Sequence, residues 1–307
     1  MSAIVCDCDD AGLQNTGLPS CITKFGVTKK LIMVPLYDDT GVKNYIDLTA
    51  TIDAAYINGK LNETDKSQRW YPIGGDIKNI AKTKSESTKQ TYEDGSVYPI
   101  QEGVYSFTGI FPNANQVFAG ILKASRCSQF GIYEIDNSGS LRGYTNNEVD
   151  VLYPIPVNNN TWEPIWNDVS DTVLENTTLN FQYDSNFVPE YLQVLSTSDI
   201  TGINLLNVVG LIDVLSTNVS CSTTVLVVKL RTKFNTPVKG LVDTDFAIYN
   251  VTDSASKAIS TSVESPNGTY TITFSGTGNA AGEVIRLTPT KAAFDFTAVI
   301  ANTATIV

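Results

Sequence analysis

Short stretches that alternate apolar and polar residues recur at even spacing between residues 222 and 307, and this pattern most restricts the fold. In residues 270–274 (YTITF), Tyr, Ile and Phe alternate with Thr, so the apolar side chains share one face of a strand. The turn residues Asn267 and Gly268 come shortly before it. About seven strands at this spacing predict a β-sandwich over residues 219–307.

Residues 1–218 contain further strand-like stretches, which predict a second domain. Residues 30–36 (KLIMVPL) indicate a buried strand that ends near Pro35. Residues 116–125 and 187–194 are each compatible with a short helix, and β-branched residues favour a strand over a helix in residues 203–215. The predicted fold class is mainly β: a barrel-like or sandwich-like domain with one or two short helices, followed by the β-sandwich.

A long polar stretch stands out in the first domain. Residues 78–91 are rich in Ser, Thr and Lys and lack apolar periodicity, which indicates an exposed edge strand or a loop. From Thr91 the pattern becomes hairpin-like, with a turn at residues 93–95 and alternating residues at 104–111. Such a stretch is suited to pair with the sheet edge of a neighbouring subunit.

The chain contains no histidine, which narrows the possible chemistry. Ser-His-Asp and Cys-His catalysis and every His-ligated metal centre are excluded. A carboxylate-pair glycosidase stays possible, with Asp47 and Asp53, or Glu93 and Asp94, as conceivable pairs, but sequence cannot set the separation of two carboxyl groups. Solvated surface charge is the simpler account of these acids, and we expect no enzymatic activity.

The formal net charge is −11, which disfavours the basic surface that phosphate binding requires. The same charge suits a wall along which nucleic acid passes without binding. No stretch is long and apolar enough to cross a bilayer. The first ten residues lack the basic region and apolar core of a signal peptide. We therefore expect neither a membrane span nor a signal peptide.

Three of the five cysteines, Cys6, Cys8 and Cys21, lie among turn residues, and residues 1–25 are expected to form an extended arm. Together with Cys127 they could supply the four thiolates of a zinc site. The spacing lacks the C-x2-C pairs of zinc ribbons. A disulfide, which would start reduced in a cytoplasm, and unlinked thiols in a packed arm are the alternatives. No other cofactor is expected.

Two further patterns have simple interpretations. Residues 38–41 (DDTG) and 136–139 (DNSG) look like calcium loops but lack the distal bidentate Glu, so they are predicted to be β-turns. Four aromatic residues could stack on sugars or bases, but packing or interface roles are expected in a β-rich protein. They are Trp70, Tyr71, Trp162 and Trp166.

The C-terminal segment resembles bacterial immunoglobulin-like modules of the invasin and phage-surface type. The resemblance rests on residues 236–241 (TPVKGL), 245–250 (DFAIYN) and 267–274 (NGTYTITF), and the segment is about a quarter of the chain. The Cys…Trp…Cys pattern of antibody domains is absent. The resemblance implies an immunoglobulin-like sandwich that decorates the surface of a virion protein.

The first two thirds of the chain are similar to virion proteins of tailed phages of Bacteroidota-type hosts. The similarity rests on residues 15–21 (NTGLPSC), 30–38 (KLIMVPLYD), 69–72 (RWYP), 91–95 (TYEDG) and 103–107 (GVYSF). It implies a tail tube subunit that is assembled in the bacterial host cytoplasm and resides in the virion.

A tail tube subunit would form a homo-oligomeric ring, expected to be a hexamer, from residues 1–218. Such rings would stack on themselves, contact other tail or virion proteins and let DNA pass without specific binding. The alternative function is that of a phage head fibre or adhesin, in which the C-terminal domain attaches to the host surface. Ring formation by the purified protein distinguishes the two functions.

Overall fold

The computed structural model describes residues 24–146, 148–275 and 279–307. The chain divides into two compact units, the first ending at Gly210 and the second covering residues 211–307. Strands dominate both units and the helices are few and short, which confirms the predicted mainly β fold class. The boundary predicted at 218/219 falls inside strand β16 (Ile212–Cys221), so the structural boundary lies eight residues earlier.

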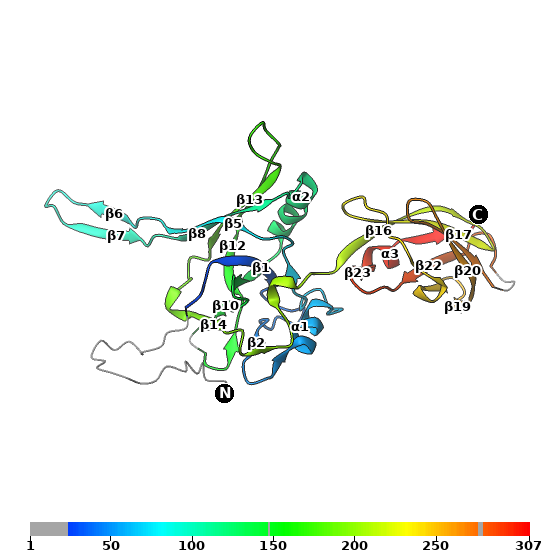
Figure 1. Ribbon diagram of the computed structural model, residues 1–307, viewed down its shortest axis with the longest axis horizontal. Helices are drawn as coiled ribbons and strands as arrows, with labels where there is room; N and C mark the ends of the chain where they lie inside the picture. Colours follow the sequence, from blue (N-terminus) through cyan, green and yellow to red (C-terminus); the bar gives the residue numbers. More distant parts are fainter. Residues whose placement is uncertain (1–23, 147, 276–278) are drawn as a thin grey trace. The chain divides into compact units, whose positions relative to one another are not determined.

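The first unit is built on a nine-stranded sheet (Figure 1). Its main path runs β14-β10-β9-β12-β13-β8-β5, and β1 joins β9 and β4. The strands are β1 (Thr28–Pro35), β4 (Tyr71–Pro72), β5 (Lys78–Lys84), β8 (Tyr105–Pro112), β9 (Phe130–Asp136), β10 (Leu141–Tyr144), β12 (Ile155–Asn167), β13 (Asn176–Tyr183) and β14 (Leu192–Leu195). The buried strand predicted at residues 30–36 is confirmed as β1.

Strand β12 divides the sheet into two halves. Ile155 and Pro156 pair with β9, and from Val157 onward the strand pairs with β13, with an irregularity in that pairing between Asn158 and Glu163. The sheet curls around an aromatic core in which the rings of Phe107 and Phe181 stack with centroids 4.8 Å apart. The two halves approach each other again where the Ile77 amide donates to the Lys29 carbonyl at 3.0 Å. This curling gives the first unit its barrel-like character.

Two short helices cover the sheet, and each starts at a side-chain cap. Helix α1 (Ala54–Leu61) is capped by Asp53, and helix α2 (Gln116–Ala124) is capped by Asn115. Helix α2 confirms the helix predicted at residues 116–125. Helix α1 and the short strands β2 (Ile46–Asp47), β3 (Ile52–Asp53), β11 (Val151–Leu152) and β15 (Ile200–Thr201) lie around a second core. Strand β9 is therefore buried along its whole length.

Two predictions in the first unit need correction. The helix predicted at residues 187–194 is wrong, because only a 3-10 turn (Pro189–Tyr191) forms before β14 pairs with β10. The strand predicted at residues 203–215 is right only from Ile212, because residues Leu205–Asn207 form another 3-10 turn. The buried ammonium of Lys30 donates to the Leu206 carbonyl within this turn and to the Val208 carbonyl just after it, which draws the segment onto the sheet.

The second unit is a sandwich of two sheets around one core. The five-stranded sheet has the order β20-β21-β17-β16-β23, and the four-stranded sheet has the order β19-β18-β22-β24. Besides β16, the strands are β17 (Val225–Thr232), β18 (Phe246–Asn250), β19 (Ala255–Lys257), β20 (Ile259–Ser265), β21 (Thr269–Phe274), β22 (Val284–Pro289), β23 (Phe294–Asp295) and β24 (Thr303–Thr305).

Strand β21 has the predicted faces, with Tyr270, Ile272 and Phe274 buried. The buried Tyr270 hydroxyl donates to the Val238 carbonyl at 3.0 Å, so its polar end is satisfied inside the core. Near the end of this unit a short helix, α3 (Thr297–Ala301), precedes β24. The Asp295 carboxylate accepts hydrogen bonds from the Thr297 amide and hydroxyl, which turns the chain into this helix.

Candidate assembly surface

A two-stranded arm extends from the first unit between β5 and β8 (Figure 1). Strands β6 (Thr88–Thr91) and β7 (Val97–Gln101) pair antiparallel with each other. Their turn is closed by the Asp94 carboxylate, which accepts hydrogen bonds from the Ser96 amide and hydroxyl, and by Gly95 at a φ of +81°. The hairpin predicted from Thr91 onward is confirmed, and residues 78–91 form two exposed strands rather than a loop.

The arm carries apolar side chains that no described part of the chain covers. Tyr98 is 60% exposed and Ile100 is 64% exposed, and Tyr92 and Val97 are exposed as well. The rings of Tyr92 and Tyr98 meet edge to face with centroids 5.6 Å apart, so one aromatic pair bridges the two strands. Clustered apolar surface on a two-stranded ribbon is typical of a segment that binds another protein.

The arm is joined tightly to the ladder beneath it. The Ser85 amide donates to the Val104 carbonyl at 3.0 Å, and the Val104 amide donates to the Ser85 hydroxyl at 2.9 Å. A Cβ atom on Gly103 would lie only 1.7 Å from the Ser85 carbonyl oxygen, so this close approach requires glycine. Lys84 and Glu102 form an ion pair at 3.0 Å just below. These contacts set the direction in which the arm leaves the sheet.

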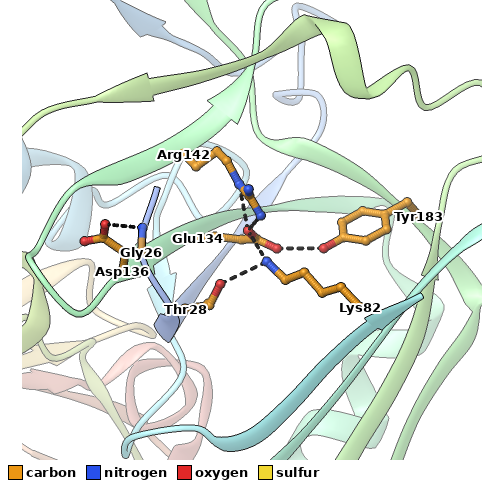
Figure 2. A network of polar contacts seen from close by, with 7 residues as sticks. All are labelled: Gly26, Thr28, Lys82, Glu134, Asp136, Arg142 and Tyr183. Carbon is orange, nitrogen blue, oxygen red and sulfur yellow. Dashed lines mark hydrogen bonds and ion pairs between the residues drawn. The ribbon is translucent and has the colours of Figure 1, made fainter. Parts of the chain in front are cut away.

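A buried ionic network lies behind the base of the arm (Figure 2). Glu134 on β9 is fully buried, and its carboxylate forms ion pairs with Lys82 on β5, at 2.7 Å, and with Arg142 on β10. The Tyr183 hydroxyl donates to the other carboxylate oxygen at 2.6 Å, and the Lys82 ammonium also donates to the Thr28 hydroxyl at 2.9 Å. Four strands on the main path of the sheet, together with β1, therefore meet at one carboxylate.

The electrostatics of this network keep Glu134 ionised. Burial by itself would raise the pKa of Glu134, but the charges of Lys82 and Arg142 outweigh that effect. Hydrogen bonds from Lys82 and Tyr183 act in the same direction, and the pKa of Glu134 lies below its ordinary value. A carboxylate held in this way ties the strand at the base of the arm to the centre of the sheet.

Residues 25 and 26, which precede β1, contact Arg142 of this network and the neighbouring Asp136. The Arg142 guanidinium lies over the Phe25 ring, 4.2 Å from its centroid, and the Gly26 amide donates to the Asp136 carboxylate at 2.8 Å. Hydrogen bonds also hold the Asp136 carboxylate within its own turn, through the Ser138 and Ser140 amides. The network thus fixes both the root of the arm and the point where the N-terminal segment reaches the sheet.

A second projection lies at the turn between β12 and β13 (Figure 1). Its tip exposes Val169, Val173 and Leu174, the last at 71% exposure. The Trp166 indole N–H donates to the Glu175 carboxylate at 2.7 Å, which leaves the partly exposed ring on the side of the hairpin. This tip is a second apolar surface that the described chain does not cover.

The cysteine site cannot be assembled from the described residues. Cys6, Cys8 and Cys21, with most of the predicted extended arm, lie outside the described ranges. Cys127 is exposed at the end of the 3-10 turn that follows α2, and it forms no disulfide with Cys221, which is buried in the second unit. Within residues 24–146, 148–275 and 279–307, no group of three potential metal-ligating side chains comes together.

The predicted turns are confirmed. The Asp38 carboxylate accepts hydrogen bonds from the Thr40 and Val42 amides, and Asp136 closes its turn in the same way. A hydrogen bond from the Thr40 hydroxyl at 2.7 Å, followed by the bond from the Val42 amide, lowers the pKa of Asp38. Asp47 and Asp53 serve local roles as well, because Asp47 bonds to Thr49 and Asp53 caps α1. The structure thus gives each of these acids a turn or cap role.

The aromatic residues divide between packing and surface. Trp70 and Trp162 are buried in the two cores of the first unit, as the packing interpretation expected. Trp166 and Tyr71 are at least partly exposed. Sequence reasoning missed the Glu134 network and the second projection. The only signal for the network was one acidic residue in the apolar run FGIYEI at residues 130–135.

Comparisons with known proteins add no relative. No protein-family model, curated protein or solved structure matches this chain. Among the residues that the structure describes, no helix has the length and apolar character needed to cross a membrane.

Proposed function

We propose that this protein is a structural virion subunit that assembles with copies of itself, and that its role is that of a tail tube subunit. The observation that carries the proposal is the β6–β7 arm, which exposes Tyr98 and Ile100 on β7, together with Tyr92 and Val97, opposite the polar strand β6. Burial of such side chains against another subunit is favourable by roughly 1.5–3 kcal/mol for each large apolar side chain. Covering these side chains in a neighbouring subunit would stabilise the assembled state over the free one.

Ring closure requires two different surfaces that fit each other, because the contact is head to tail. The sheet of the first unit ends in β5 on one side and in β14 on the other. Strand β5 pairs only with β8 among the described strands, so its other edge has no strand partner there. Pairing of the β5 edge in one copy with the β14 edge in the next would continue the sheet around a ring, for which we propose six subunits.

Stacking of rings requires a second interface, which the arm can supply. Its base at Ser85 and Gly103 is rigid, so the arm reaches outward in a defined direction without prior ordering. The tip between β12 and β13 offers another apolar contact of the same kind. The net charge of −11 suits a channel through which DNA passes without binding. Assembly in the host cytoplasm and contacts with other virion proteins belong to the same proposal.

The experiment is electron microscopy of the purified full chain and of variants in the arm. Tyr98→Ser combined with Ile100→Ser should abolish rings or tubes, because the apolar contact of the arm is lost. The control combines Lys89→Ser with Gln90→Ser on the opposite strand, which removes polar side chains only and should leave assembly intact. A wild-type protein that stays monomeric at high concentration, with no rings in lysates, would refute the tube assignment.

A head fibre or adhesin is the second candidate function. It is favoured by the second unit, which has its own core and two complete sheets and so could act as a separate binding module. Binding of isolated residues 211–307 to host cells, together with a monomeric or trimeric full chain, would support this function over the tube.

A further inference from the structure

A cleft opens on the first unit at one end of the curled sheet, away from the features used above. Two hollows of 170 Å³ and 630 Å³ adjoin there and share Leu36 and Tyr37, which follow the end of β1. Pro156 and Val157 at the start of β12 form part of the floor. The volume of the larger hollow lies within the ~300–1,000 Å³ that small-ligand sites usually span.

One side of the cleft is aromatic. Tyr37 is 44% exposed and lines both hollows, and Tyr153 lines the smaller one. Tyr45 meets Tyr153 edge to face at 6.0 Å, and the Lys43 ammonium lies 5.5 Å from the centroid of the Tyr153 ring. These contacts hold the Tyr153 ring in place. The exposed Tyr37 ring offers flat apolar surface to the C–H groups of a ligand, whereas Tyr153 is half-buried and its hydroxyl donates to the Glu148 carboxylate at 3.0 Å.

The other side is rich in amides. Asn158, Asn159, Asn160 and Gln129 line the larger hollow. The Asn158 side-chain carbonyl already accepts from the Asn160 amide at 3.2 Å. The side-chain oxygen of Asn159 is buried and accepts no hydrogen bond from the described part of the chain. A buried acceptor without a partner costs roughly 1–3 kcal/mol, and the amide groups that line the hollow supply donors and acceptors for ligand hydroxyls.

Charge and backbone pairing narrow the class of ligand. Lys43, Arg126 and Asp184 are the charged lining residues, so the lining carries both signs, and the Arg126 guanidinium already donates to the Asn160 carbonyl at 2.7 Å. An extended peptide that binds as an added strand needs a free strand edge. At this cleft the backbone of Tyr37 already pairs with that of Lys43, and the backbone of Tyr153 pairs with that of Tyr144. What remains is a neutral ligand with apolar faces and many hydroxyl groups.

We propose that this cleft binds a neutral saccharide. Sugar rings would stack on Tyr37, and their hydroxyls would bond to the amide wall. The site lies in the first unit, so it differs from host attachment through the second unit. It also does not depend on ring formation, because no residue of the arm or of the sheet edges contributes to it.

The test uses the full chain and a panel of neutral oligosaccharides built from glucose, galactose, mannose and N-acetylglucosamine. Binding is measured by saturation-transfer NMR and by titration calorimetry. At least one oligosaccharide should bind, and Tyr37→Ala and Asn159→Ala should each weaken that binding at least tenfold. Phe234→Ala, at an exposed aromatic position outside the first unit, is the matched control and should leave binding unchanged. Thermal melts verify that Tyr37→Ala, at an exposed position, stays folded.

Three outcomes would overturn the proposal. They are the absence of binding across the panel, binding that survives both Tyr37→Ala and Asn159→Ala in folded protein, and binding of proline-rich peptides in place of sugars. Electron microscopy of the same variants tests the tube assignment independently of the saccharide-binding cleft. Sugar binding by a monomeric protein would refute the tube assignment alone, and rings without sugar binding would refute the cleft alone.

Discussion

The Tyr183 hydroxyl donates to the Glu134 carboxylate at 2.6 Å, although the two residues are 49 positions apart in the chain. Tyr183 ends β13 in one half of the curled sheet, and Glu134 lies on β9 in the other half (Figure 2). Their contact joins the halves of the sheet across the core, beside the root of the arm. The stability of the first unit should therefore depend on this one carboxylate.

Glu134→Gln should destabilise the first unit by about 3–5 kcal/mol, because it leaves Lys82 and Arg142 without their buried counter-charge. Tyr183→Phe should cost about 1–3 kcal/mol, since only one hydrogen bond to the carboxylate is lost. Urea denaturation followed by circular dichroism measures both effects. Glu93→Gln, in the exposed turn of the arm, is the control, and an equal loss there would contradict the special role of Glu134.

The pH dependence of stability follows from the same carboxylate. The pKa of Glu134 is lower in the folded state than in the unfolded state, where it is about 4.3. Its contribution to stability is therefore complete above that unfolded value and is lost as the pH falls through the folded pKa. Melting temperatures between pH 6 and pH 3 should fall less steeply for Glu134→Gln than for the wild type. Parallel curves would show that Glu134 is not the titrating group.

The second unit should fold by itself as residues 211–307, because its core contains only residues of that unit. Within it, Ile272→Asp should cost several kcal/mol, on the order of an unpaired buried charge, because Ile272 is fully buried. Thr271→Asp, on the opposite face of β21, should be nearly neutral. Chemical denaturation of the fragment compares the two variants. A fragment without a cooperative transition would contradict the independence of this unit.

The local sequence pattern was sufficient to predict the β-sandwich of the second unit, but it was not sufficient to predict the ionic network around Glu134. The alternation in β21 identifies its buried face without knowledge of any neighbour, because strand periodicity is a property of five consecutive residues. Glu134 could be seen in sequence only as an acid in an apolar strand. Its partner Lys82 lies 52 positions away in a polar stretch that gives no sign of burial. Long-range pairing of this kind follows from the curling of the sheet.

The error in the helix predicted at residues 187–194 also arises from long-range strand pairing. The sequence of residues 192–195 (LQVL) is compatible with either a helix or a strand. These residues form a strand because they pair antiparallel with β10. The cleft was missed because its tyrosines and asparagines come from separate turns and strand ends that only the fold brings together. The turns at Asp38 and Asp136 were predictable, because each one is closed by its own side chain within four residues.

The final prediction concerns the root of the arm. Gly103→Ala would place a Cβ 1.7 Å from the Ser85 carbonyl oxygen, and a backbone oxygen cannot move aside as a flexible side chain could. The two strands must therefore separate at this point, and the arm should leave the sheet in a changed direction. Because Gly103 belongs to none of the hydrophobic cores, the protein should stay folded.

We expect Gly103→Ala to block ring stacking in electron micrographs while the circular dichroism spectrum stays that of the wild type. The matched control is Gly120→Ala in α2, where an added Cβ meets no atom within 4 Å. That change should preserve assembly and raise stability by up to about 1 kcal/mol, since alanine favours a helix. Normal tubes from Gly103→Ala would mean that the direction of the arm does not govern assembly, and the stacking role would then pass to the tip between β12 and β13.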